Sequence, residues 1–243
     1  TRSLQQDGYV TGVFGKWGLS GPGSTGAPEN QGFDRFFGYN CQRLAHHYYP
    51  EHLWDNATRI ELPGNRDGGR AVYAPELIHR RTLEFIEANR EQPFFLLVAT
   101  PLPHADLDAP DDYLARHRGL YGEETPYRGV DHGPKFRQGP YISQPTPKAA
   151  YAAMINVLDD QVGDIIATVE RLGLTGDTLI IFTSDNGPAG EGGGNPANFD
   201  SSGDLRGAKR DVHEGGIRVP MIARWPGQVP PGVTSDLVCA GWD

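Results

Sequence analysis

The sequence predicts an α/β fold in which helices form a sandwich around a largely parallel β-sheet. The main observation is that a helical segment precedes a short apolar run three times, with the runs at residues 9–14, 94–99 and 178–182. This alternation is typical of parallel sheets, because a crossover helix must return the chain to the start of the next strand. Hydrophobic residues make up 37% of the 243, which is enough for one packed core.

The chain opens with the end of a helix and a first strand. Residues 1–8 are expected to form a helix that ends at Gly8, because glycine after the last helical residue is a frequent stop signal. Residues 9–14 are rich in β-formers and predict a strand that runs on into Lys16. Residues 22–70 are rich in Gly, Pro, Asn and aromatic residues without sustained periodicity. They predict a long ordered excursion without regular structure.

A second helix and a second strand follow. Pro75 suits the first turn of a helix, and apolar residues then recur on one face until about Asn89. Residues 94–99 are apolar throughout, which is typical of a strand covered on both faces. Residues 105–148 are rich in Pro, Gly and charged residues and predict a second long loop.

The clearest helix spans residues 149–172. Its apolar residues are spaced by one, three or four positions, which gives an amphipathic face, and Gly173 ends it. Residues 178–182 predict another buried strand, and residues 187–216 a Gly-rich loop. Residues 217–222 predict an edge or irregular strand, because an internal proline removes a ladder hydrogen bond.

Charge and composition argue against several classes of protein. The net charge is −9, from 22 Lys and Arg against 31 Asp and Glu, whereas binding nucleic acid needs clustered positive charge. The apolar run at 94–99 is far shorter than the roughly 20 residues of a membrane span, so none is expected. Cys41 and Cys239 are the only cysteines, so neither a disulfide framework nor a cysteine zinc site is expected.

Polar side chains follow each of the apolar runs. In open parallel sheets, ligands bind beyond the carboxyl ends of the strands, so these residues are expected to meet at one rim. Lys16 ends the first strand, His104 follows the second, and Asp185 and Asn186 follow the third. A cation, an acid–base imidazole and two hard oxygen donors suit an oxyanion bound beside a hard metal ion. Lys209 in the Gly-rich loop, flanked by two arginines, can add positive charge.

Each of these residues also has a purely structural explanation. Lys16 can lay its stem on the neighbouring tryptophan, a single loop histidine is often a surface residue, and Asp-Asn-Gly is an ordinary turn. Together they favour a functional site, because a turn does not explain why two hard donors end an apolar strand. His46 and His47 either line a pocket or pack in the interior, and the sequence leaves both open.

Six motifs carry a family resemblance. They are GVFGKWGL at residues 12–19, GFDRFFG at 32–38, PH at 103–104, LDDQVG at 158–163, TSDNGP at 183–188 and GAKRDVHEGGIRVP at 207–220. In this order they resemble the type I, formylglycine-dependent sulfatases of the arylsulfatase branch. The resemblance implies an alkaline-phosphatase-like α/β/α sandwich, in agreement with the fold predicted above.

The resemblance also implies roles for individual residues. Asp185 and Asn186 would be ligands of a metal ion, Ca²⁺ by preference, with Mg²⁺ possible. Lys16 and Lys209 would hold the sulfate oxygens, which suits their charge. His104 would donate a proton to the leaving oxygen, since a positioned imidazole can act as a general acid near neutral pH.

The chain departs from the family pattern in three ways. The family's formylglycine nucleophile is made from Cys or Ser in a C/S-x-P-x-R motif, and neither cysteine here lies in one. Two further Asp ligands are expected upstream. Gly18 stands where many members carry His, and His46 or His47 is the candidate replacement as a substrate-binding residue. We therefore expect residues 1–243 to be the central part of a sulfatase catalytic domain, incomplete at both ends and inactive alone, without the nucleophile segment and the C-terminal subdomain.

The functional prediction is a sulfuric ester hydrolase that acts on sulfate monoesters of aryl or carbohydrate substrates. The expected partner is a small-molecule or glycan sulfate ester, and the resemblance suggests a periplasmic or secreted protein. Two alternatives stay open. One is a phosphomonoester or phosphodiester hydrolase of the same superfamily, which would favour more metal ions. The other is a non-catalytic anion-binding pseudoenzyme, because the nucleophile motif is missing from this chain.

Overall fold

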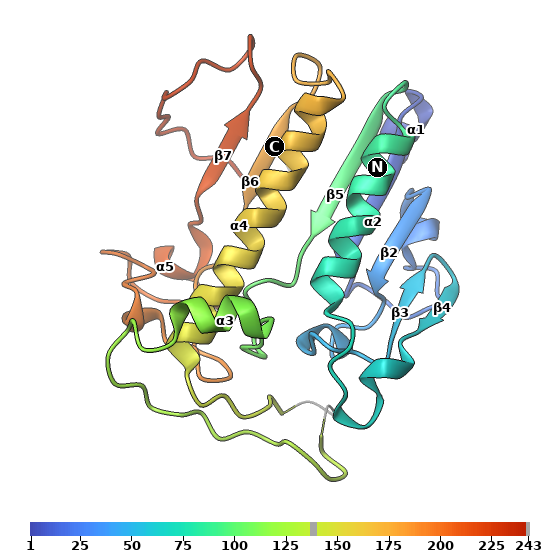
Figure 1. Ribbon diagram of the computed structural model, residues 1–243. Helices are drawn as coiled ribbons and strands as arrows, with labels where there is room; N and C mark the ends of the chain where they lie inside the picture. The colour runs from blue at the N-terminus through green and yellow to red at the C-terminus, as the bar shows by residue number, and fades with distance from the viewer. Residues whose placement is uncertain (137–139, 242–243) are drawn as a thin grey trace.

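The computed structural model describes residues 1–136 and 140–241 (Figure 1). Its main sheet has five strands in the order β4-β3-β2-β1-β5. The strands are β1 (Val10–Lys16), β2 (Arg35–Tyr39), β3 (His52–Asp55), β4 (Thr58–Glu61) and β5 (Phe94–Ala99). β1 pairs in parallel with both β2 and β5, whereas β3 and β4 extend the sheet antiparallel. The predicted fold class, an α/β fold with a largely parallel central sheet, is confirmed.

A second sheet contains β6 (Ile180–Thr183) and β7 (Met221–Arg224), which pair antiparallel. The α-helices are α1 (Arg2–Gln6), α2 (Ala74–Ala88), α3 (Asp111–His117), α4 (Pro147–Arg171) and α5 (Glu214–Ile217). Short 3₁₀ helices are η1 (Pro28–Gln31), η2 (Leu44–His46), η3 (Pro63–Gly68) and η4 (Pro196–Asn198). The predicted helices over 1–8, from Pro75 to Asn89 and over 149–172 match α1, α2 and α4 to within a few residues.

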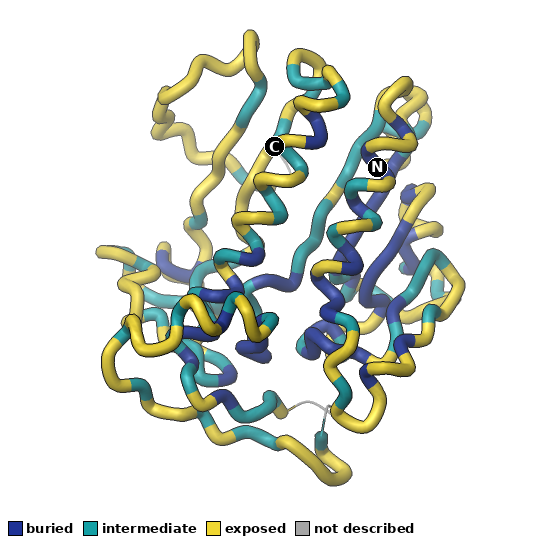
Figure 2. Tube along the Cα trace, viewed as in Figure 1, coloured by how far each residue is buried: buried dark blue, intermediate teal, exposed yellow. Residues whose placement is uncertain are grey.

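Residues on alternate positions of β1 and β2 build two apolar layers. Phe14 and its neighbours on one face pack against Phe85 of α2, with ring centroids 5.4 Å apart. Val13 and Phe36 on the other face pack with Phe33, which follows η1. Helices α2 and α4 contact each other and lie on the same side of the strands (Figure 1). The deepest burial is along β1, β2 and the inner face of α2 (Figure 2).

The prediction that residues 22–70 lack regular structure is wrong. This segment contains β2, β3 and β4 as well as three 3₁₀ helices. The three strands are only four or five residues long, too short to show a period, and β2 gains its place by pairing with β1. The predicted loop 105–148 likewise holds α3, and residues 137–139 within it lie outside the described residues.

The expectation that residues 94–99 and 178–182 are covered on both faces is also wrong for the described part of the chain. Leu97 of β5 is 42% exposed and Ile181 of β6 is 54% exposed. Among the described residues, β5 pairs only with β1, and β6 only with β7, so each strand keeps an unpaired edge. An apolar run records what a strand is made of but not which neighbours cover it.

Residues 217–222 were expected to form an edge or irregular strand, and the structure places the strand slightly later. Ile217 ends α5, and β7 begins at Met221, directly after the proline. β7 has β6 as its strand partner, which agrees with an edge position. Among the described residues, no helix is both long and apolar enough to cross a membrane.

Gly15 is a position at which the parallel strands pack tightly, and it provides a test of the sheet. Its φ is +125°, and a Cβ added there would overlap the carbonyl oxygen of Ala99 on β5. We expect Gly15→Ala to lower the free energy of unfolding by about 2 kcal/mol or more, because neither backbone can give way cheaply. Urea unfolding followed by circular dichroism measures the change.

The matched control is Gly21→Ala, since a Cβ at Gly21 meets open space. It should change stability by no more than about 0.5 kcal/mol. Equal stability of the Gly15→Ala variant and the unsubstituted protein would show that β1 and β5 are not packed as described.

Candidate functional site

The carboxyl ends of β1, β5 and β6 bring the predicted site residues together. Lys16 is the last residue of β1, and His104 lies in the turn after β5. Lys209 reaches the same place from the Gly-rich loop, with its Nζ 2.8 Å from Nε2 of His104. The charge of Asp185, after β6, acts on Lys16. Four residues separated by up to 193 positions, Lys16 to Lys209, therefore lie near one another. The strand-end argument accounts for Lys16 and His104, whereas β6 before Asp185 lies in the second, antiparallel sheet.

The hydrogen bonds of His104 define its tautomer. Nδ1 lies 2.6 Å from the carbonyl oxygen of Ala105, and a carbonyl can only accept, so Nδ1 carries a hydrogen. Nε2 of the neutral ring is then the acceptor for the ammonium of Lys209. Burial lowers the pKa of His104, and the charges of Lys209 and Lys16 lower it further. The hydrogen bond to Ala105 and the charge of Glu191 oppose this shift.

Lys16 sits among other charges. Its pKa is lowered, first because the side chain is half-buried and then because Lys209 lies close. The carboxylates of Asp185 and Glu191 act in the opposite direction. Two ammonium groups held near each other in a partly buried site attract an anion that can lie between them.

His46 belongs to this site, whereas His47 does not. The His46 ring stacks on the His104 ring, with centroids 4.8 Å apart and planes 7° from parallel. His47 is 2% exposed, and its Nδ1 donates to Asp106 across 2.8 Å. Asp106 also accepts from the backbone N–H of Ile142, so His47 helps to hold this loop. Its burial speaks against contact with a substrate.

Glu191 and Tyr141 belong to the site as well, and the sequence analysis missed both. Oε2 of Glu191 lies 3.4 Å from Nε2 of His104 and 3.6 Å from Nζ of Lys209, and it accepts a hydrogen bond from the Tyr141 hydroxyl. Arg210 completes the set with an ion pair to Oε1. A single acidic residue in a Gly-rich loop forms no sequence motif. Its place in the site is visible only from the cationic side chains that surround it in the structure.

Asp185 and Asn186 follow β6 in a tight turn. The Asn186 amide donates to the Asp185 carboxylate, and the Asn186 side-chain oxygen is buried without a hydrogen-bond partner. Backbone hydrogen bonds tie this turn to the Lys209 loop: the N–H of Gly187 donates to Gly216, and that of Lys209 to Pro188. An unpartnered buried oxygen beside a carboxylate suits a hard cation.

These donors fit part of a metal site. Calcium takes six to eight oxygen ligands, and Asp185 and Asn186 supply only a few of them. The described residues contain no cluster of three or more His, Cys, Asp or Glu side chains able to hold an ion. A metal ion bound here would need further ligands from water, substrate or residues outside the described part.

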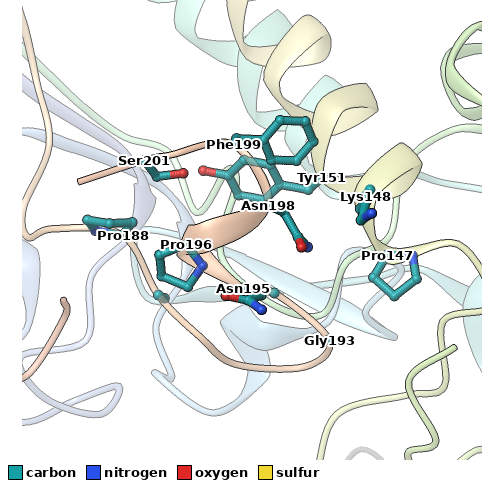
Figure 3. A pocket seen from close by; sticks show the side chains of 12 residues that line it. Pro147, Lys148, Tyr151, Pro188, Gly193, Asn195, Pro196, Asn198, Phe199 and Ser201 are labelled. Atoms are coloured by element: carbon teal, nitrogen blue, oxygen red, sulfur yellow. The ribbon is translucent and has the colours of Figure 1, made fainter. Parts of the chain in front are cut away.

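A small pocket lies beside the Glu191 loop. It is lined by Tyr151 and Lys148 of α4 and by the loop that carries Asn195 and Phe199 (Figure 3). The rings of Tyr151 and Phe199 stack with centroids 5.6 Å apart and fill much of it. Its free volume of about 10 Å³ has room for about one water molecule, so it does not bind a substrate as it stands.

Comparisons with known proteins agree with the fold. The family model described as Sulfatase matches residues 2–238. The chain is 31% identical to an arylsulfatase of Hemicentrotus pulcherrimus, over 97% of the chain and 39% of that protein. It is also 31% identical to N-acetylgalactosamine-6-sulfatase of Mus musculus, over 96% of the chain and 40% of that protein. Because this family model matches nearly the whole chain, the chain belongs to the sulfatase family.

Solved structures share the fold of this chain. The crystal structure of Ps i-CgsB in complex with k-i-k-neocarrahexaose aligns with a TM-score of 0.70 at 25% identity, covering 95% of this chain and 48% of that one. The fold of the putative sulfatase yidJ from Bacteroides fragilis aligns with a TM-score of 0.64 at 24% identity, covering 95% and 50%. The chain spans about 40% of the length of the curated relatives named above.

The stacking of His46 on His104 leads to a pH prediction. Burial lowers the pKa of His46 to about 4, helped by the charges of His104, Lys16 and His47. We expect the ring signals of His46 in a ¹H–¹³C NMR titration to stay at their neutral-form positions from about pH 8 to about pH 5. A His46→Gln variant identifies the signals by removing them. A midpoint near the ordinary value of about 6.5 would show that the ring is not buried against His104.

Proposed function

We propose that the protein that carries this chain hydrolyses sulfate monoesters of aryl or carbohydrate substrates. The observation that carries this proposal is the meeting of Lys16, Lys209 and His104 beside the oxygen donors Asp185 and Asn186. The matches to named aryl and carbohydrate sulfatases support the same activity. We also propose that residues 1–243 are the central part of the catalytic domain.

Each residue of the cluster has chemistry that suits one part of this reaction. The ammonium groups of Lys16 and Lys209 bind sulfate oxygens and offset the negative charge that develops as the ester breaks. When the S–O bond breaks, its electron pair goes to the leaving oxygen. That oxygen takes the proton from Nε2 of His104, and Nε2 keeps the N–H electron pair.

Sulfatases generally use a metal ion together with a formylglycine nucleophile. We propose that Asp185 and Asn186 contribute two oxygen ligands to a Ca²⁺ ion, or to Mg²⁺, whose charge would help to hold the sulfate group. We further propose that the formylglycine lies in a part of the protein outside this chain. None of its cysteines lies in a C/S-x-P-x-R motif.

Of the two adjacent histidines, we propose His46 as the substrate contact, because its ring stacks on that of His104, the proposed proton donor. It would stand in for the His that many family members carry at the position of Gly18. We propose a sulfated small molecule or glycan as the partner. A periplasmic or secreted location is a proposal that rests on the family resemblance alone.

Matched substrates test the proposed activity. We expect the full-length protein to cleave an aryl sulfate with a kcat/KM at least about tenfold above that for the matching aryl phosphate, because one incomplete metal site suits the less charged ester. Release of the shared phenol measures both reactions. A preference for the phosphate would make the protein a phosphoester hydrolase, and no turnover of any ester would favour the anion-binding alternative.

Metal binding tests the role of the turn after β6. We expect Asp185→Ala to weaken Ca²⁺ binding by at least about tenfold, because it removes a charged oxygen ligand. Isothermal titration of the metal-free protein with Ca²⁺ measures the affinity. The control is Asp164→Asn on α4, where the exposed carboxylate pairs with His79. Equal affinities of the two variants would contradict the assignment of Asp185.

A further inference from the structure

Glu191 is the acid at the centre of the cationic cluster. Its side chain is only 12% exposed, and its two oxygens face Lys209, Arg210, His104 and the hydroxyl of Tyr141. Burial alone raises the pKa of a carboxyl group. Here the charges of Lys209, Arg210 and His104, with the Tyr141 hydrogen bond, outweigh burial and lower the pKa of Glu191. Glu191 is therefore ionised at neutral pH.

The loop that carries Glu191 packs closely against the turn that carries His104. Glu191 precedes three glycines, and Gly192 has a φ of +58°. A Cβ at Gly192 would overlap that of Ala105, the residue next to His104. The hydroxyl of Tyr141 also holds Glu191, with Oη 3.3 Å from Oε2. The close approach thus depends on glycine at this position.

His104 faces a specific set of charged and titratable groups. They are Lys16, Lys209, Glu191, the stacked ring of His46 and the phenol of Tyr141. Both lysines disfavour a second proton on the imidazole, and the neutral phenol and imidazole do little to offset them. The only anion among these groups is Glu191, whose Oε2 lies 3.4 Å from Nε2.

The atom Nε2 is where the proton must sit for acid catalysis. Because Nδ1 is committed to Ala105, protonation of His104 can occur only at Nε2. A lysine ammonium donates and cannot accept, so Lys209 must give up its hydrogen bond when Nε2 gains a proton. Glu191 then faces the new N–H and still pairs with Lys209.

We propose that Glu191 is a positioning residue that keeps the acid proton on Nε2 of His104 and holds Lys209 beside it. Its carboxylate stabilises the imidazolium while two lysines oppose it, and the proton stays in place until the leaving oxygen takes it. The proposal rests on the proposed function for its catalytic meaning, whereas its charge argument concerns the ground state of His104 alone.

The test is the titration of His104 in the full-length protein, followed by ¹H–¹³C NMR of ring-labelled histidines. We expect Glu191→Gln to lower the midpoint of His104 by about 1 to 3 pH units, the usual effect of an opposite charge at this range. Glu191→Asp keeps the charge and should restore at least half of the shift. Glu87→Gln removes an exposed carboxylate on α2 that pairs with Arg171 of α4, and it should leave the midpoint of His104 unchanged.

Arg210→Gln is not expected to lower the titration midpoint of His104. It removes a cation that faces Glu191 and leaves the carboxylate, so the midpoint of His104 should stay or rise. A fall in both the Glu191→Gln and the Arg210→Gln variants would mean a general disturbance of the loop and would overturn the proposal. So would a Glu191→Asp midpoint equal to that of Glu191→Gln.

Activity separates this inference from the proposed function. With an aryl sulfate, the alkaline limb of the kcat/KM profile should move to lower pH in Glu191→Gln by the same 1 to 3 units or so, because the acid form is lost earlier. A higher KM with an unmoved limb would mean that Glu191 contacts substrate instead. Should no sulfate ester be cleaved while the NMR midpoint falls, the proposed function fails and the charge role of Glu191 stands.

Discussion

The parallel pairing of β1 with β5 is the constraint on which the candidate site depends. Gly15 lies opposite Ala99 in this pair and opposite Gly38 in the pair with β2, so two of the three strands carry no side chain at this level. Because the strands run in the same direction, both end at one edge of the sheet. That edge holds Lys16 directly and positions the turn that carries His104.

At this edge of the sheet, the pKa values of Lys16 and His104 depend on both burial and neighbouring charges. Two lysines in a partly buried site repel each other, and both lower the pKa of the histidine between them. The carboxylates of Glu191 and Asp185 offset this repulsion. A sulfate group, the ligand proposed for this site, would bring negative charge to the same place.

Much of the site could be read from local sequence because its residues stand at strand ends. The apolar runs before Lys16, His104 and Asp185 are visible without a structure, and the parallel strands β1 and β5 align their ends. β6 lies in the second sheet, so the position of Asp185 is a result of the tertiary structure. The strands between residues 22 and 70 were missed because four or five residues show no period, and their pairing with β1 is a long-range contact. β5 and β6 were wrongly predicted to be buried on both faces, because exposure depends on neighbouring segments rather than on the composition of the strand.

The sequence by itself determined the class of fold, the long helices α2 and α4, and the polar residues that end each apolar run, because each of these is a local pattern. Only the tertiary structure decided that His46 stacks on His104 while the adjacent His47 is buried with Asp106. It also placed Glu191 between Lys209 and Arg210. These contacts join segments far apart in the chain, and their free energy comes from burial and charge in three dimensions, which no local pattern records.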